Sequence, residues 1–334
     1  MKLIEMARLS TLFVRLARDP HTSEPLSDIE ETRDHLAEGG PCVYDLYRPK
    51  RPAIGLIVAV HGATLHGGRD LRLIHFGRCL ARSRVACAVP SLPGLTACRW
   101  EPQDVDALCA TARDAANAVR APLGIVGFSF GGSYSLVAAG RPSFADRVRF
   151  VVAFGAYHDL GALLDGYVDA RHAPSRSATD WDNWVYLNVV LAGQYADKVG
   201  LSPSVQAEAR DLLWRFCHDA TLEEKRAFYE RHLADRDLVS VAGRLQDRAV
   251  LKAISPANQL AGLRAAVSLI HDDQDTMVPP EQGERLHREA AAVVGADRCR
   301  MLRTSLLSHV SLGNVMQLTE VSRLYHALAP LAEW

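Results

Sequence analysis

The amino-acid sequence predicts an α/β fold, with a mostly parallel central sheet flanked by helices and one long helical insertion. Short apolar runs recur along the chain, as expected of parallel strands that are buried on both faces. Segments compatible with helices separate these runs, for example Asp104–Arg120 and Gln282–Val294. Strands that alternate with helices favour a parallel sheet covered by those helices. The predicted strands are Gly55–Val60, Val85–Val89, Leu123–Val126, Phe150–Phe154 and Ala266–Ile270, with a partly exposed strand at Val43–Pro49 before them.

The strand pattern stops after Asp159 and resumes at Ala266–Ile270. The sequence in between is compatible with helices and includes the aromatic run Trp181-Asp182-Asn183-Trp184. We therefore expect a helical cap, residues 159–254, inserted into a core made of residues 39–158 and 255–334. Residues 1–38 are predicted to be an N-terminal helical extension.

The first twenty residues do not have the pattern of a signal peptide. Glu5, Arg8 and Arg15 interrupt any apolar core of the required length. Apolar residues spaced by three and four positions predict an amphipathic helix, at Leu9, Leu12, Phe13 and Leu16. Docking against its own domain and attachment to a membrane surface are both compatible with such a helix. No apolar stretch is long enough to span a bilayer.

The amino-acid composition limits the classes of partner and the cellular compartment that we expect for this chain. The chain has 334 residues, with 38 Lys and Arg against 39 Asp and Glu, so its formal net charge of -1 gives no global field that would attract nucleic acid. The seven cysteines form no C-x-x-C pair. We expect reduced, mostly buried thiols and a cytoplasmic location, because secreted chains usually form disulfides.

The most informative motif is Gly127-Phe128-Ser129-Phe130-Gly131-Gly132, which follows an apolar strand and precedes a sequence that can form a helix. In the pattern G-x-S-x-G the serine lies on a sharp turn between strand and helix, and the glycines leave room for a strained backbone that presents the hydroxyl. Ser129 is thus the predicted nucleophile.

With this motif the sequence resembles the α/β-hydrolase superfamily, and within it the serine esterases and lipases that carry a helical cap. The resemblance extends over Val43–Asp159 and Ser255–Leu331. It implies an oxyanion hole formed by the backbone N–H groups of Ala63, in His61-Gly62-Ala63, and of Phe130. His61 is expected to be a structural hydrogen-bonding residue. The glycine pair in the loop from His66 to Asp70 either shapes the substrate entrance or forms a flexible turn.

The resemblance also implies the other two members of a catalytic triad. Asp275 occupies the acid position of the loop that ends in Val278-Pro279, and His309 follows at the position expected of the histidine. Asp159, beside His158, is the competing acid. We expect Asp272 and Asp273 to be solvated, and a metal site with His271 is the lesser alternative.

Serine, aspartate and histidine, in this chain order, predict acyl transfer to water without metal or organic cofactor. Hydrolysis of a carboxylic ester, with a small-molecule acyl substrate, is the leading hypothesis. Thioester, lactone, peptide and carbon–carbon bond hydrolysis would use the same residues, and a non-catalytic ligand-binding protein is the alternative from another class. Whether the chain forms a homodimer stays open. Candidate substrate-binding residues are His61, His66, Trp181, Trp184 and Met277.

Overall fold

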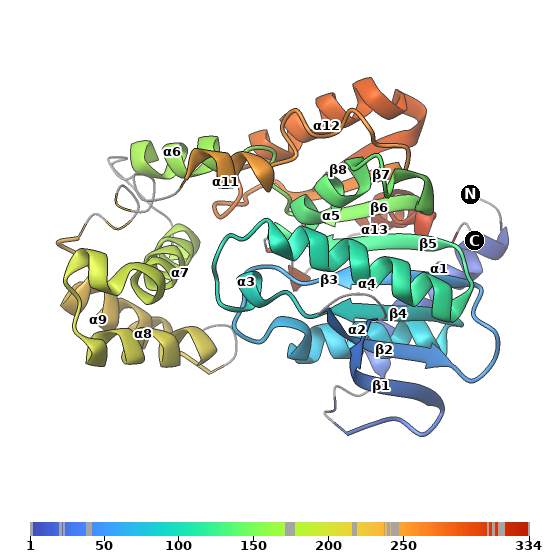
Figure 1. Cartoon of the computed structure of the whole chain (residues 1–334), viewed down its shortest axis with the longest axis horizontal. Helices are drawn as coiled ribbons and strands as arrows, with labels where there is room; N and C mark the ends of the chain where they lie inside the picture. Colours follow the sequence, from blue (N-terminus) through green and yellow to red (C-terminus); the bar gives the residue numbers. More distant parts are fainter. Residues whose placement is uncertain are drawn as a thin grey trace.

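The computed structural model has a central eight-stranded sheet with the strand order β1-β2-β4-β3-β5-β6-β7-β8 (Figure 1). β1 and β2 are antiparallel to their neighbours, and every pair from β4 to β8 is parallel, which confirms the predicted fold class. The strands are β1 (Ile29–Leu36), β2 (Val43–Pro49), β3 (Gly55–Val60), β4 (Val85–Pro90), β5 (Leu123–Phe128), β6 (Val148–Phe154), β7 (Ala266–Asp272) and β8 (Cys299–Thr304). The structure describes residues 3–19, 22, 24–37, 42–170, 178–215, 219–236, 238, 241, 247–305, 307–308, 311–312 and 318–332.

Helices cover both faces of the sheet because successive strand residues point to opposite sides. In β3, Leu56 and Val58 belong to a core cluster with the helices of one face, whereas Ile57 and Ala59 belong to a second cluster with the helices of the other face. The first face carries α4 (Gln103–Val119), α5 (Phe130–Gly140) and α12 (Pro280–Val294), and the second carries α1 (Leu3–Arg18), α2 (Leu71–Arg82) and α13 (Leu318–Ala327).

β1 lies within the segment that was predicted to be a helical extension, so that prediction is wrong for residues 29–36. β1 is an edge strand with mostly polar residues, and this is why it lacks the apolar alternation of a strand. Glu31 on β1 forms a buried ion pair with Arg78 on α2, in which Arg78 Nε lies 2.9 Å from Glu31 Oε1. A charged strand residue therefore has a partner in the interior.

The N-terminal helix α1 docks against its own domain. Leu9 and Leu12 are buried, and the ring of Phe13 stacks on that of Tyr325 of α13, with the centroids 4.8 Å apart. The predicted apolar stripe is thus covered by the chain itself, which confirms the docking interpretation. None of the helices within the described residues is long and apolar enough to cross a membrane.

Between β6 and β7 the described chain contains helices and no strand. They are α6 (Leu160–Ala170), α7 (Ala178–Tyr195), η3 (Ala196–Val199), α8 (Pro203–Arg215), α9 (Leu222–His232) and α11 (Arg248–Ala253). α7 packs against α8 and α9, and α6 packs against α11. Figure 1 shows α7, α8 and α9 beyond the end of the sheet where α3 (Pro93–Thr96) lies.

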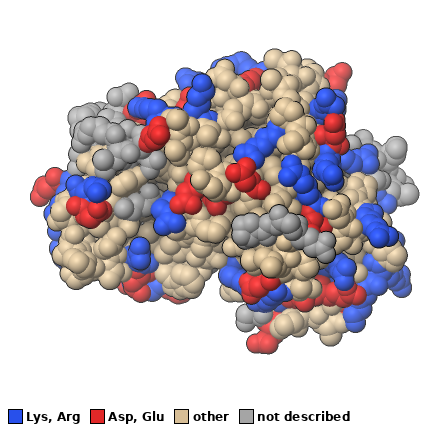
Figure 2. Space-filling view, in the orientation of Figure 1, with Lys and Arg blue, Asp and Glu red and all other residues tan. Residues whose placement is uncertain are grey.

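The six described cysteines are free and buried. Burial raises the pKa of Cys79 to about 12 and that of Cys299 to about 11, so these thiols stay protonated and poorly reactive near neutral pH. Cys217 lies outside the described residues. Charged side chains of both signs are mixed over the face shown in Figure 2, in keeping with the near-zero net charge.

Candidate active site

Ser129 lies on a strained turn between β5 and α5. Its backbone angles are φ 53° and ψ −123°, a conformation that residues with a Cβ atom rarely adopt. Such a conformation costs on the order of 1–3 kcal/mol and persists only where the surrounding structure enforces it. Part of that enforcement is the hydrogen bond from the Ser129 N–H to the Phe154 carbonyl at the end of β6, at 2.7 Å.

The glycines of the motif are required by close approaches of backbone to backbone. A Cβ atom on Gly127 would lie 2.4 Å from the Gly131 carbonyl oxygen. A Cβ atom on Gly131 would lie 2.3 Å from the His61 oxygen and 2.4 Å from the Val60 oxygen. Any side chain at either position would therefore push α5 away from the strand ends, and the serine turn with it.

The loop after β3 passes directly beside Ser129. A Cβ atom on Gly62 would lie 3.1 Å from Ser129 Cβ and 3.7 Å from Ser129 Oγ. Ala63 is the next residue, and Phe130 is the first residue of α5. The first N–H groups of a helix have no partner within the helix, and the helix dipole favours negative charge there. The geometry is therefore compatible with the predicted pair of N–H donors at Ala63 and Phe130.

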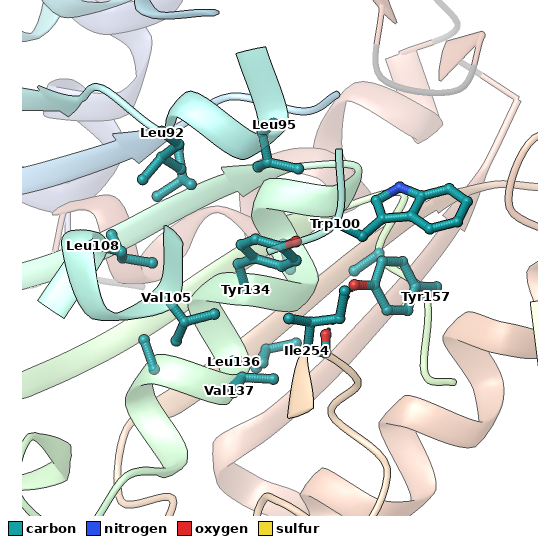
Figure 3. Packing of buried hydrophobic residues seen from close by; sticks show 14 of the residues in the cluster. Leu92, Leu95, Trp100, Val105, Leu108, Tyr134, Leu136, Val137, Tyr157 and Ile254 are labelled. Atoms are coloured by element: carbon teal, nitrogen blue, oxygen red, sulfur yellow. Dashed lines mark hydrogen bonds between the residues drawn. The ribbon is translucent and has the colours of Figure 1, made fainter. Parts of the chain in front are cut away.

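The ring of Phe130 is fixed among aromatic neighbours. It lies parallel to the Trp100 ring, with an interplanar angle of 5° and centroids 6.2 Å apart, and edge-on to the Tyr157 ring at 5.0 Å. Figure 3 shows Trp100 and Tyr157 side by side, with Ile254 next to Tyr157. The Tyr157 hydroxyl donates to the Ile254 carbonyl at 2.8 Å. These contacts restrain the beginning of α5 where the nucleophile stands.

Asp275 lies in a tight turn after β7. Its Oδ1 accepts hydrogen bonds from the N–H groups of Met277 and Val278, both at 2.9 Å. The residue is buried. Burial, together with the nearby Asp275 carboxylate, raises the pKa of Tyr167 on α6, so an inserted helix lies close to this acid. Two backbone donors hold the carboxylate in one orientation.

Sheet topology sets the distance between Ser129 and Asp275. Ser129 follows β5 and Asp275 follows β7, and β6 lies between these strands. At about 4.8 Å between neighbouring strands, the two strand ends are roughly 10 Å apart. Both residues lie at the carboxyl edge of the sheet. A serine and an aspartate cannot touch across that gap, so an intermediate group has to link them.

His309 lies outside the described residues. The strands on either side of it, β9 (Leu307–Ser308) and β10 (Ser311–Leu312), form an antiparallel pair. β9 contacts β7, the strand that leads to Asp275. The assignment of His309 as the proton carrier stays a prediction.

His61 makes the local contact expected of a structural residue. Its Nδ1 lies 2.7 Å from the Gly62 carbonyl oxygen, which can only accept, so Nδ1 carries the hydrogen. Burial lowers the pKa of His61, and the ring is therefore neutral near pH 7. Its Nε2 atom is buried and has no hydrogen-bond partner within the described residues.

Asp159 and His158 are engaged in structural contacts. The Asp159 side chain accepts from the Ala162 N–H at the start of α6, at 3.1 Å, which is the contact of a helix N-cap. His158 Nε2 lies 2.7 Å from the Glu289 carboxylate of α12. Both contacts account for these residues without catalysis.

Of the two remaining acids after β7, one differs from expectation. Asp272 is buried rather than solvated, because it lies at the end of β7 and accepts from the Gln274 N–H at 3.0 Å. Asp273 is exposed, as predicted, and pairs with Arg303 at 2.8 Å. His271 is buried, with Nε2 at 2.7 Å from the Val278 carbonyl oxygen. Within the described residues, no three potential ligands gather into a metal site.

Two inserted helices contact the loop after β3. Tyr186 of α7 donates its hydroxyl to the Ala63 carbonyl at 2.8 Å. His66 Nε2 lies 2.8 Å from the Trp214 carbonyl of α8, and the two rings are tilted by 37° with their centroids 4.1 Å apart. Neither Tyr186 as a partner of Ala63 nor Trp214 was identified from the sequence, since no local pattern links positions more than 120 residues apart.

The other predicted substrate-binding residues have different surroundings. Trp184 is half buried, and its Nε1 donates to the Tyr229 hydroxyl of α9 at 3.1 Å, so it contributes to packing among the inserted helices. Trp181 belongs to α7, and its side chain lies outside the described residues. Met277 contributes its backbone N–H to the Asp275 turn.

Solved structures have a similar fold, whereas no family model and no curated protein sequence matches the chain. An esterase from Pyrococcus furiosus is similar at 13% identity and a TM-score of 0.51, over 93% of this chain and 96% of that one. Carboxyl esterase 2 from Tuber melanosporum is similar at 14% identity and a TM-score of 0.50, over 100% and 98%. A puromycin-hydrolysing peptidase from Mycobacterium tuberculosis is similar at 18% identity and a TM-score of 0.52, and the match covers 93% of this chain but 40% of the peptidase. At these identities the likeness concerns the fold.

The strain at Ser129 predicts a difference between two substitutions that both remove the hydroxyl. Ser129→Gly relieves the unfavourable backbone conformation, while Ser129→Ala keeps it. Glycine has greater conformational entropy in the unfolded chain, which lowers the stability of the Ser129→Gly variant. Even so, we expect Ser129→Gly to be more stable than Ser129→Ala by about 1 kcal/mol. Urea unfolding of both variants measures the free energies. Equal stabilities, or a more stable alanine variant, would contradict a strained turn.

Proposed function

We propose that this chain, which has the α/β-hydrolase fold, is a serine hydrolase that cleaves a carboxylic ester through an acyl-serine intermediate. The observation that carries the proposal is the backbone of Ser129, held at positive φ between β5 and α5 with Gly62 packed against its side chain. A serine needed only for structure gains nothing from a strained turn. Strain of this kind is typical of residues whose side chain must be presented for chemistry.

The proposed reaction has two halves. His309 removes the Ser129 hydroxyl proton as Oγ attacks the ester carbonyl, and the tetrahedral intermediate collapses when His309 returns the proton to the departing alkoxide. Water then attacks the acyl-serine, with His309 again taking and delivering a proton, and the acid leaves. Asp275, fixed by two backbone N–H donors, orients the imidazole and stabilises its charged form.

The proposed oxyanion hole consists of the Ala63 and Phe130 N–H groups. They come from two separate segments, the loop after β3 and the beginning of α5, which converge at Ser129. Preorganised donors of this kind stabilise the negative charge that develops on the carbonyl oxygen. We also propose that the inserted helices act as a cap over this site, since α7 and α8 contact the loop that carries Ala63.

The similar solved structures support hydrolysis as the type of reaction, since two are esterases and one is a peptidase. Acyl transfer to water is the simplest reaction for these residues, because the proposed mechanism needs no metal or organic cofactor, and a carboxylic ester is the leading substrate class. A series of p-nitrophenyl esters and acyl-CoA thioesters of increasing acyl length separates an esterase from a thioesterase. Binding of the same compounds without turnover would favour the ligand-binding alternative.

An activated nucleophile predicts covalent labelling. An alkyl fluorophosphonate should modify Ser129, and mass spectrometry of peptides should locate the adduct there. Ser129→Ala should abolish labelling and lower kcat by about 10⁵ to 10⁶-fold, because a triad acts as a unit. Ser143→Ala, which replaces an exposed serine, is the control and should label fully. Labelling that persists in Ser129→Ala would exclude Ser129 as the nucleophile.

The acid assignment is tested by two amide substitutions. Asp275→Asn favours the wrong imidazole tautomer and removes the charge that stabilises imidazolium, so kcat should fall by about 10⁴-fold. Asp159→Asn should cost less than about 10-fold, because asparagine is as good a helix N-cap as aspartate. The measurement is ester hydrolysis at saturation, with circular dichroism to verify folding. If Asp159→Asn is the variant that loses activity, the catalytic acid is the one that follows β6.

Tyr186 is proposed as a positioning residue for the oxyanion hole, through its bond to the Ala63 carbonyl. Removing an oxyanion donor outright costs about 10² to 10³-fold, so loosening the loop with Tyr186→Phe should lower kcat by about 10-fold with little change in KM. Tyr229→Phe is the matched control, because it removes a hydroxyl that bonds Trp184 within the inserted helices. Equal losses in both variants would indicate a general packing effect instead.

A further inference from the structure

A cavity of about 380 Å³ lies at the opposite edge of the sheet from Ser129. It is lined by the first residues of β6 and β7, by η4 (Ala296–Arg298), by β8 and by η5 (Ala329–Ala332). These are the amino ends of parallel strands, whereas Ser129 follows the carboxyl end of β5. With strands of six or seven residues, the two edges are roughly 20 Å apart. The cavity therefore does not belong to the catalytic site.

The charged residues that line the cavity are unbalanced. Arg149, Arg298 and Arg300 face one acid, Asp297, so the lining carries a net charge of +2 (three positive charges and one negative). Within the described residues, none of these three arginines has a carboxylate partner. Two of them are held by backbone carbonyls, as Arg298 donates to Arg264 at 2.6 Å and Arg300 donates to His326 at 3.3 Å. In each of these two arginines one N–H group is hydrogen-bonded to a carbonyl, so the other donors of the guanidinium can bind a ligand.

A buried hydroxyl lies in the same wall. Ser268 is fully buried, and its Oγ has no hydrogen-bond partner within the described residues. Ser268 stands opposite Arg300 in the register of β7 and β8, so the two side chains leave the same face of the sheet, toward α13. An unpaired buried hydroxyl destabilises the folded chain, and a ligand that bonds it would offset that cost.

The remaining lining is apolar and includes Phe150, Ala266 and Pro330. A cavity of this volume is at the lower end of the range for small organic ligands. A mostly cationic lining with a small apolar part suits a molecule that has an anionic head and a small apolar body. The net charge of +2 matches a dianion better than a monoanion.

We infer that this cavity binds a small organic phosphate monoester, with the phosphate between Arg149, Arg298 and Arg300 and the organic group against the apolar wall. At pH 7 such a phosphate carries a charge of about −1.5 to −2, and planar guanidinium groups bind its oxygens in pairs. The inference is independent of the proposed hydrolase activity, because no catalytic residue lines the cavity.

Calorimetric titration with phenyl phosphate tests the inference. Benzoate, with the same ring and a single charge, and inorganic phosphate, without the ring, should each bind about 10-fold more weakly. The double variant Arg149→Ala with Arg300→Ala should bind phenyl phosphate at least about 10-fold more weakly, since each lost hydrogen bond to a charged group costs that much or more. Arg264→Ala is the matched control, an exposed arginine of the same edge that is already paired with Asp146.

The variant Ser268→Ala gives a further measurement, which a general effect of surface charge would not change. Without ligand this variant should unfold at a higher temperature than the parent protein, because an unpaired buried hydroxyl is removed, and it should bind phenyl phosphate more weakly. No heat of binding in the parent protein at about 10 mM phenyl phosphate would overturn the inference. So would equal losses in the Arg264→Ala control and the double variant, or unchanged affinity in Ser268→Ala.

Discussion

The contact between α5 and the end of β3 is the constraint on which the candidate active site depends. The backbone of Gly131 lies so close to the carbonyl oxygens of Val60 and His61 that only a hydrogen atom fits between them. With α5 fixed there, the chain must turn within one residue of the end of β5, and Ser129 has to adopt its positive φ. The same closeness brings Gly62 against the serine and thereby places Ala63 beside it. One packing contact between a helix and the end of a strand therefore determines both the strain at the nucleophile and the neighbouring backbone donors.

The sequence predicted those parts of the fold whose signals are local. The apolar runs of the parallel strands are visible because both faces of each strand are buried. The serine motif is visible because it is a short contiguous pattern, although Gly131 is required by the distant Val60 and His61. β1 was missed because an edge strand needs no apolar alternation, and its buried charge, Glu31, depends on Arg78 of α2. Asp272 was misjudged for a related reason, since its burial follows from its place at the end of a central strand.

Contacts between distant segments were beyond prediction from the sequence. Tyr186 meets Ala63, and Trp214 meets His66, only because two of the inserted helices contact the loop after β3. No pattern within either segment contains that information. For the two candidate acids the structure adds information that the sequence lacks. Asp159 caps a helix, whereas Asp275 accepts hydrogen bonds from two backbone N–H groups. The assignment of His309 as the proton carrier is based on the sequence and on the pairing of β9 with β10 beside β7.

The two edges of the sheet are joined by β6, which has Phe150 in the arginine-rimmed cavity and Phe154 bonded to the Ser129 N–H. These residues are four positions apart, roughly 13 Å along the strand. A ligand in the cavity stabilises the folded chain by mass action, by an amount proportional to the logarithm of one plus the ratio of its free concentration to its Kd. A change in catalytic rate would further require two arrangements of the connecting element, each favoured by a different ligand state. A central strand that is hydrogen-bonded on both sides offers a single arrangement. Binding at the amino edge should therefore protect the fold while leaving the chemistry at Ser129 unchanged.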